Sequence, residues 1–241
     1  MLYKTRAVIL YQMNYSDVYT IVHVYTEAFG PVSYLTAKSK SKTTRVPKSF
    51  FHPLAVVDLE VEHQNLREIQ RIKEAKPHFP LFSILTEPVK STICIFLAEV
   101  MAKVLKDKQP DALLFDYLLQ SIRILELSEN NYANFHLVFL IRLSRFIGFY
   151  PDNSEYRKGM VFDLQNGIFI PHKPYHIQFL NPDESEVFHH LLRMSYENMS
   201  QFQFARNERK DILYRILEYY RLHLSSFSEI KSLEILHEVF G

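Results

Sequence analysis

The chain has 241 residues, of which 47% are hydrophobic and 23% charged, which is typical of a folded protein with one large or two small domains. Its net charge is only +1, and its five glycines never take the spacing of phosphate-binding loops, which excludes P-loop and Rossmann enzymes. A single cysteine, an N-terminus unlike a signal peptide and only short apolar runs predict a cytoplasmic protein without disulfides or a membrane partner.

The first 37 residues predict three β-strands. Apolar and polar residues alternate from Tyr3 to Met13 and again from Val18 to Tyr25, and a third strand is expected from Val32 to Ala37. On the first strand, Ala7, Ile9, Tyr11 and Met13 are expected to share one face.

A basic segment follows these strands. Residues 1–80 hold eleven Lys and Arg against seven Asp and Glu, whereas the remainder holds more acids than bases. Residues 38–48 contain no acid and almost no apolar side chain, and Pro47 opposes regular structure, which predicts a loop. Lysine and arginine release counterions from phosphate backbones, so we interpret the segment as a DNA contact, although a solubilising loop remains an alternative. Its cations are Lys38, Lys40, Lys42, Arg45 and Lys48.

Two further strands predict closure into a barrel. Ala55, Val57, Leu59 and Val61 share one face of a fourth strand, and residues 66–76 predict a fifth, bulged strand. Five strands joined as a meander with one long loop indicate an OB-type β-barrel over residues 1–80. Such barrels bind single strands with basic grooves and aromatic platforms. Arg6, Arg67, Arg71 and Lys73 could extend the cationic track, and the aromatic candidates are Tyr11, Tyr15, Tyr19, Tyr34, Phe50 and Phe51.

Residues 81–241 predict a mainly helical domain. Pro88 follows a polar pair at a helix start, and Cys94 lies in an apolar stripe where a core role is expected. Residues 152–180 interrupt the helices as an irregular insert with a small β-hairpin around Asn166-Gly167. The expected fold class is therefore multidomain α+β, and the expected helices are near 88–104, 114–125, 132–147, 182–192, 208–224 and 230–240.

The helix at 132–147 is apolar on most sides and carries only two cations, Arg142 and Arg145. They can form surface ion pairs, or they can border a groove for an acidic peptide with an apolar end.

Two patterns raise the question of metal chemistry. Asp58, Glu60 and Glu62 alternate on one strand face, as in a Mg²⁺-dependent nuclease, but exposed solubilising charge explains them as well. The histidine pairs 172/176 and 189/190 lack a metal-binding motif, so no metal or cofactor is expected.

The order of these parts resembles the RecO family of bacterial recombination mediators. The resemblance covers nearly the whole chain and rests on several motifs with their spacing. They are residues 4–10 (KTRAVIL), 25–30 (YTEAFG), the basic loop before 51–54 (FHPL), the strand 66–74, 147–151 (IGFYP) and 162–169 (FDLQNGIF).

The sequence departs from the family pattern after the hairpin. Many family members carry a four-cysteine zinc site there, whereas Pro171 and Pro174 stand here at the interval of a cysteine pair. The insert is therefore expected to be a zinc-less variant, stiffened by proline.

The resemblance implies a non-enzymatic role in recombinational DNA repair, in the RecF pathway. It implies binding of single- and double-stranded DNA, strand annealing, and binding of the acidic C-terminal tail of single-strand binding protein. It also implies that the chain works with RecR to load RecA and is associated with the nucleoid. A scaffold that captures an acidic peptide through the helical domain, with little DNA binding, is the alternative.

Overall fold

A computed structural model describes residues 1–37, 46–64 and 67–239, so Lys38, Lys40, Lys42 and Arg45 lie outside the described residues. The chain forms two compact units, one of residues 1–127 with 229–240 and one of residues 128–228. The first unit contains both the barrel and the helices that directly follow it. The domain boundary predicted between residues 80 and 81 therefore stays a prediction.

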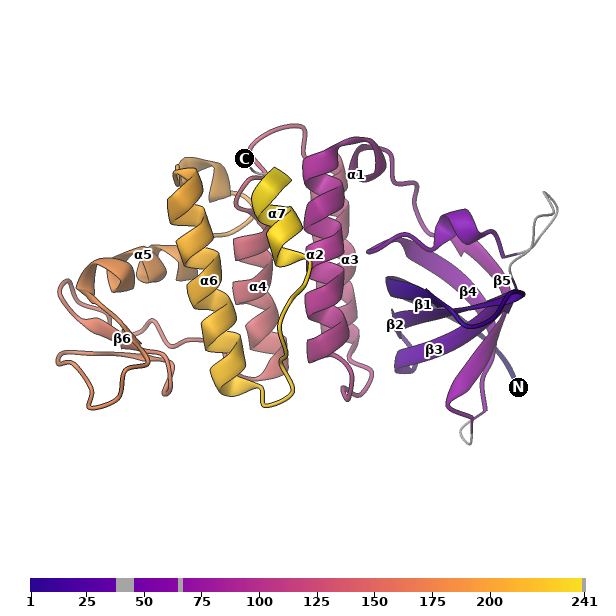
Figure 1. Ribbon diagram of the computed structural model, residues 1–241, viewed down its shortest axis with the longest axis horizontal. Helices are drawn as coiled ribbons and strands as arrows, with labels where there is room; N and C mark the ends of the chain where they lie inside the picture. Colours follow the sequence, from indigo (N-terminus) through magenta and orange to yellow (C-terminus); the bar gives the residue numbers. More distant parts are fainter. Residues whose placement is uncertain (38–45, 65–66, 240–241) are drawn as a thin grey trace. The chain divides into compact units, whose positions relative to one another are not determined.

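The N-terminal strands close into a five-stranded barrel of the OB type, as expected (Figure 1). The barrel is not a meander, because β3 pairs with β5 in parallel and β4 lies between β5 and β1. The long connection between β3 and β4 permits this crossing, which a short hairpin would not. The strands are β1 (Leu2–Asn14), β2 (Tyr19–Thr26), β3 (Gly30–Ala37), β4 (Val56–Glu62) and β5 (Ile69–Pro77).

The barrel interior is filled by the alternating apolar residues that the sequence predicts. All four apolar residues predicted for one face of β4 are buried. The predicted irregularity of β5 is confirmed as a register shift opposite Glu60 and Val61, which gives Ile72 and Ala75 buried positions three residues apart.

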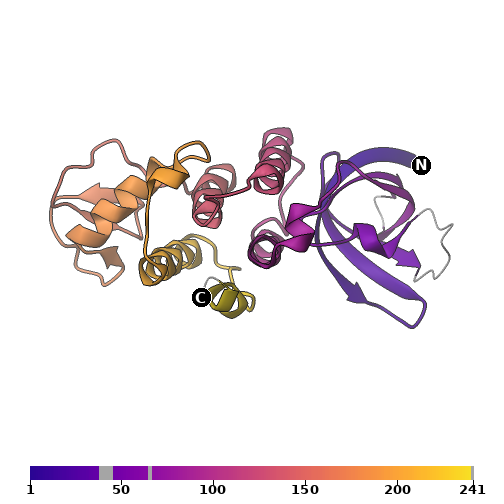
Figure 2. The same ribbon diagram turned by 90° about the horizontal axis from the view of Figure 1, so that it is seen from above.

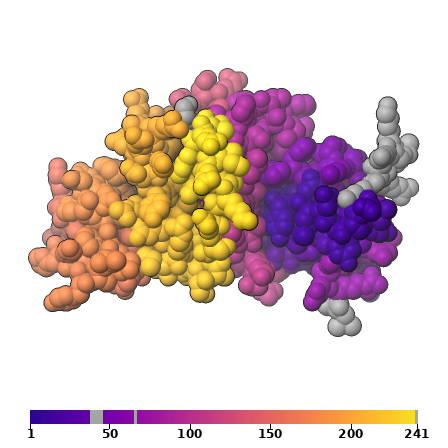
Figure 3. Space-filling model, viewed as in Figure 1, coloured from indigo at the N-terminus to yellow at the C-terminus, as the bar shows by residue number. Residues whose placement is uncertain are grey.

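A second irregularity, in β1, reverses the predicted orientation of its C-terminal half. The pairing register shifts between Ile9 and Tyr11, so Ala7 and Ile9 lie in the core whereas Tyr11 and Met13 are exposed. Val8 is also fully buried, on the side of β1 that contacts α2 (Pro88–Val104; Figures 1 and 2). The indigo residues of β1 form part of the barrel surface in Figure 3.

Two carboxylates fasten the helices of the first unit. Glu126 accepts hydrogen bonds from three successive backbone amides, those of residues 82–84, at the start of α1. Glu99 on α2 accepts the amides of Lys231 and Ser232, which lead into α7. Besides α2, this unit contains η1 (Lys48–Phe50), α1 (Ser83–Thr86), α3 (Ala112–Leu127) and α7 (Leu233–Val239).

Close backbone approach explains one glycine of the barrel. Gly30 has a φ of +67°, and a Cβ there would lie 2.9 Å from the carbonyl oxygen of Lys108. The side chain of Tyr25 crosses the same gap, donating to the carbonyl of Gln109 and accepting from the amide of Asp111. The turn before β3 is thereby held against the α2–α3 connection.

The second unit combines three helices with a small sheet. The predicted hairpin is present, but a third strand joins it to give the order β7-β6-β8. The first helix begins at Phe135 rather than Tyr132, because residues 132–135 form a turn in which the Phe135 amide donates to the Tyr132 carbonyl. The Asn134 side chain donates to the carbonyls of Met199 and Phe202. The elements are α4 (Phe135–Ile147), β6 (Val161–Asp163), β7 (Ile168–Ile170), β8 (Phe179–Leu180), α5 (Pro182–Leu192), η2 (Met199–Gln201) and α6 (Arg206–His223).

Within the described ranges, no helix is long and apolar enough to cross a membrane.

Candidate nucleic-acid interface

The outer surface of β1, β2, β3 and β5 carries two rows of side chains that the pairing register brings together. The first row runs Tyr11, His23, Ser33, Ile69 from strand to strand. The second row lies two residues further along each strand and consists of Met13, Ile21, Leu35 and Arg71. We call this surface the aromatic face.

The first row is ordered by ring stacking and a hydrogen bond. The rings of Tyr11 and His23 stack with centroids 4.2 Å apart, and His23 Nδ1 lies 2.9 Å from the Ser33 hydroxyl. Burial lowers the pKa of His23, so its ring is neutral at pH 7. The stacked pair is therefore uncharged, and the exposed ring of Tyr11 is of the kind on which bases stack.

Further tyrosines extend this platform at the end of the β1–β2 hairpin. The side chains of Tyr11, Tyr15 and Tyr19 are 43%, 61% and 41% exposed. The other aromatic candidates are not available, because Tyr34 and Phe51 are fully buried and Phe50 packs against the barrel core. The structure thus brings together three of the six aromatic residues singled out in the sequence.

Three predicted cations border the aromatic face from β5 and the loop before it. Arg67, Arg71 and Lys73 are exposed, and Arg71 follows Leu35 in the second row. The Lys73 ammonium lies 3.0 Å from Glu62 and holds the pKa of that carboxyl below its usual range, so part of its charge is neutralised. Lys48, the one loop cation within the described ranges, is also exposed.

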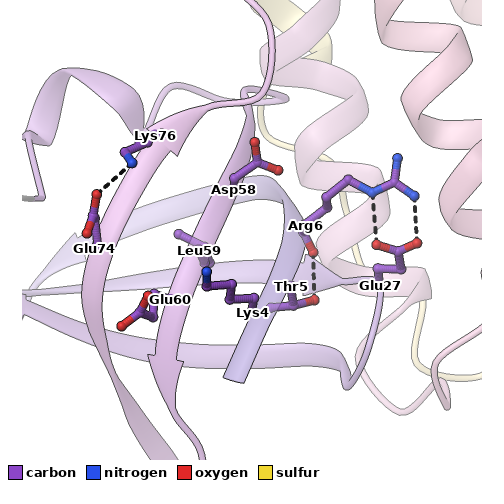
Figure 4. A pocket seen from close by; sticks show the side chains of 9 residues that line it. All are labelled: Lys4, Thr5, Arg6, Glu27, Asp58, Leu59, Glu60, Glu74 and Lys76. Atoms are coloured by element: carbon purple, nitrogen blue, oxygen red, sulfur yellow. Dashed lines mark hydrogen bonds and ion pairs between the residues drawn. The ribbon is translucent and has the colours of Figure 1, made fainter. Parts of the chain in front are cut away.

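Arg6 lies elsewhere, in a pocket of about 550 Å³ on the outer surface of β1, β4 and β5 (Figure 4). Its guanidinium donates two hydrogen bonds to Glu27, at 2.8 and 2.6 Å, and lies 5.3 Å from the ring centroid of Phe115. The hydrogen bond from Arg6 lowers the pKa of Glu27, and Glu27 in turn raises that of Arg6. Arg6 is committed to this pair and not to the aromatic face.

The rest of this surface, which we call the paired face, consists of polar side chains that pair with one another. Lys76 lies 2.9 Å from Glu74, and Asp58 lies 3.0 Å from His78 Nδ1. Figure 4 shows Lys4 and Glu60 on neighbouring strands of the same pocket.

The carboxylates considered for Mg²⁺ are dispersed by these contacts. Asp58 pairs with His78 and Glu62 with Lys73, on different strand positions. Among the residues that the structure describes, no three His, Cys, Asp or Glu side chains are grouped to hold a metal ion. In the second unit, His176 lies 3.3 Å from Asp163, and His189 Nδ1 lies 2.7 Å from the Asn153 side chain.

The two arginines of α4 differ in their surroundings. Arg142 is half-buried and donates to the carbonyl of Met194 at 3.2 Å. Arg145 is exposed, and its guanidinium carbon lies 4.4 Å from the ring centroid of Tyr150. Neither takes part in an ion pair within the described part of the chain, in contrast to the surface ion pairs considered from the sequence.

Sequence reasoning missed His23 and Ser33 as members of the aromatic face. Strict alternation puts His23 opposite the predicted face of Tyr11, and only the β1 register shift turns the two rings together. The sequence did contain a signal for them, since His23 and Ser33 are polar residues within two neighbouring strands that are otherwise mainly apolar.

Comparison with known proteins identifies the family. Residues 1–80 match the family described as recombination protein O N terminal, and residues 85–234 match recombination protein O C terminal. The chain belongs to the RecO family. The family therefore confirms the resemblance drawn from the sequence, and it gives the chain a role in DNA repair.

Relatives named DNA repair protein RecO match over their whole length. The chain is 64% identical to the protein of Azobacteroides pseudotrichonymphae and 40% identical to that of Phocaeicola vulgatus, with 100% of each chain covered. It is 31% identical to the protein of Flavobacterium psychrophilum, with 99% of each covered.

Proposed function

We propose that this RecO family member binds single- and double-stranded DNA without sequence preference through the aromatic face and the basic loop. The observation that carries the proposal is the position of exposed Tyr11 and Tyr19 on the same outer surface as exposed Arg71. Stacking and phosphate contacts are the two interactions that bind single strands without reading their sequence. The phosphate contacts are assigned to Lys38, Lys40, Lys42, Arg45, Lys48, Arg67, Arg71 and Lys73.

Arg6 is left out of this track. The Nε and Nη2 groups of Arg6 both donate hydrogen bonds to the Glu27 carboxylate, so a phosphate would have to displace this bidentate partner.

A salt titration with labelled oligonucleotides tests the proposal. If about four cations contact a single strand, log K falls against log[salt] with a slope of about −3. Replacing the five cations of residues 38–48 by alanine is expected to flatten this slope by about half or more. A matched variant that replaces five exposed cations outside the barrel, Lys106, Arg157, Lys158, Lys210 and Lys231, is the control. An unchanged slope in the loop variant would contradict the assignment.

Annealing follows from binding of this kind. A surface that neutralises phosphates and holds bases by their faces lowers the repulsion between two strands without reading either. We propose that the chain anneals complementary strands and acts without catalysis. The measurement is the rate of fluorescence quenching as two labelled complementary strands pair, and incubation of labelled DNA with Mg²⁺ or Mn²⁺ tests for cleavage.

The family resemblance extends the proposal to protein partners. We propose that the chain works with RecR to help load RecA onto single strands covered by single-strand binding protein, and that it binds the acidic tail of the latter. Exposed Arg145 over Tyr150 is a suitable contact for a carboxylate next to an apolar side chain.

The scaffold alternative assigns the main activity to this peptide contact. Titration of a labelled acidic tail peptide against Arg145→Ala and Arg142→Ala separates the two arginines. Loss of affinity is expected for Arg145→Ala, whereas Arg142, which donates to a backbone carbonyl, is expected to act through the position of residue 194.

A further inference from the structure

The second unit contains a groove between α5 and α6, the two helices labelled in Figure 1, that the DNA-binding proposal does not use. We propose that this groove binds a basic peptide segment of a partner protein, with one bulky apolar side chain of that segment inserted between the helices. The pocket has a volume of about 450 Å³, and all the residues that line it belong to residues 180–215.

The floor of the groove is apolar. Leu180, Phe188 and Ile212 are buried beneath it, and the half-buried side chains of Val187 and Phe204 form its walls. A cavity of this size accepts one large aliphatic or aromatic side chain, and its burial there would supply the apolar part of the binding energy.

The rim is acidic. Asp183 and Glu184 come from the first turn of α5, and Glu208 and Asp211 from the start of α6. The only cation in the lining, Arg215, is neutralised by hydrogen bonds to Glu184 and Glu218 at 2.8 Å. The groove therefore presents a net negative rim around an apolar floor.

The helix ends do not cancel this charge. The N-termini of α5 and α6 contribute partial positive charges of about half a unit each. Three carboxylates of the rim do not contact Arg215, and their negative charge exceeds this positive charge. Glu184 and Glu208 accept the backbone amides of Asn181 and Ala205, so they serve the helix caps and are fixed in place. Exposed Asp183 and Asp211 take no part in the caps and are available to meet lysine or arginine.

Charge complementarity decides between possible occupants. A nucleic acid would meet carboxylates at this rim, and an acidic peptide would be repelled, whereas a basic segment gains attraction together with apolar burial. The groove thus differs in partner chemistry from both the aromatic face and the Arg145 contact.

The test uses the full chain and a fluorescein-labelled, amidated peptide in which lysines flank a central Phe-Leu pair. Its counterpart has every lysine replaced by glutamate. Fluorescence anisotropy at low salt is expected to show binding of the basic peptide and at least about tenfold weaker binding of the acidic one. Hydrogen exchange is expected to slow at the starts of α5 and α6 when the basic peptide is bound.

Variants locate the site. Asp183→Asn with Asp211→Asn is expected to weaken the basic peptide about three- to tenfold, and Val187→Thr, which keeps the shape of the wall, is expected to weaken it as well. The control, Glu129→Gln with Glu155→Gln, removes the same charge from exposed positions of the second unit outside the groove. Circular dichroism establishes that each variant is folded.

Three results would overturn the proposal. These are equal affinity for the two peptides, an unchanged affinity in the Asp183/Asp211 variant, and an equal loss in the Glu129/Glu155 control. A concentration-dependent dimer in light scattering, abolished by Val187→Thr, would also overturn it, because a second copy of the chain would then be the occupant.

Discussion

The aromatic face and the paired face of the barrel contain similar numbers of cations but use them differently. On the paired face, Arg6 is bound by Glu27 and Lys76 by Glu74, so part of their charge is neutralised within the barrel. On the aromatic face, Arg71 is exposed at the end of a row of uncharged side chains, and its register partner on β4 is Glu62, which already pairs with Lys73. A count of basic residues therefore predicts a phosphate-binding surface poorly, because pairing with carboxylates decides which cations remain accessible.

The difference originates in the strand sequences. The acids Asp58, Glu60 and Glu62 occupy the outer surface of β4, where Glu62 pairs with Lys73 of β5. Arg6 and Lys76 pair instead with Glu27 and Glu74, which lie outside β4. Strands β2 and β3 contain no Asp or Glu, and their outer side chains are tyrosine, histidine, serine and aliphatic residues. A polyanion would therefore meet mutually paired charges on one side of the barrel and no carboxylate of β2 or β3 on the other.

The largest effect is expected from removing the rings of the aromatic face. Tyr11→Ala with Tyr19→Ala should weaken single-stranded DNA binding about tenfold or more, because each stacked base contributes about 1–3 kcal/mol. The affinity for double-stranded DNA should change less, because the bases of a duplex already stack on one another. Equilibrium titration with both DNA forms measures the ratio. Tyr175→Ala, at a fully exposed tyrosine of the second unit, is the control, and an equal loss there would refute the platform.

A second experiment compares two cations on the same strand. Arg71→Gln and Lys76→Gln remove one charge each from β5, the first from the aromatic face and the second from the paired face. Removing one phosphate contact should reduce the salt slope by about 0.7 for Arg71→Gln, with no change for Lys76→Gln. Equal slopes for the two variants would show that the two faces do not differ in DNA contact.

The sequence predicted the barrel because alternation and burial agree along β4. The irregularity of β5 was predicted from the spacing of Ile69 and Ile72, but Ile69 is exposed, and the register shift instead gives Ile72 and Ala75 their buried positions. The crossing of β4 to β1 could not be predicted, because alternation specifies which side chains are buried but not which strand is the neighbour.

The candidate site was predicted only in part. Composition directed attention to Arg71 and Tyr11, but the same reasoning included Arg6, whose partner Glu27 lies on another part of the barrel. Pairing across strands depends on register. The register of β1 shifts between Ile9 and Tyr11, and nothing in the sequence around these residues indicates that shift. Long-range pairing is the information that a single sequence lacks.

A third prediction concerns Arg6. Arg6→Ala should lower the free energy of unfolding by about 1 kcal/mol, because a bidentate but partly exposed ion pair and a ring contact are lost. Single-stranded DNA affinity should stay within about twofold of the parent chain, because the guanidinium is not assigned to phosphate. Urea unfolding and DNA titration on the same preparation measure both quantities. A large loss of affinity without loss of stability would return Arg6 to the DNA track.

The smallest effect is expected in the pH dependence of stability. Hydrogen bonding to Arg6 holds the pKa of Glu27 below its ordinary value of 4.5 in the folded chain. The unfolded chain therefore binds the proton more readily, so the stabilisation is fully present above about pH 4.5 and is lost as pH falls through the lowered pKa. Urea unfolding of the parent chain and of Glu27→Gln should give free energies that differ at about pH 7 and converge toward about pH 3. Other carboxyls with lowered pKa, such as Glu99 and Glu126, remain in both proteins and cancel in this difference. A gap that stays constant across this range would mean that the carboxylate charge of Glu27 does not stabilise the paired face, and that its packing or hydrogen bonding as a neutral group suffices.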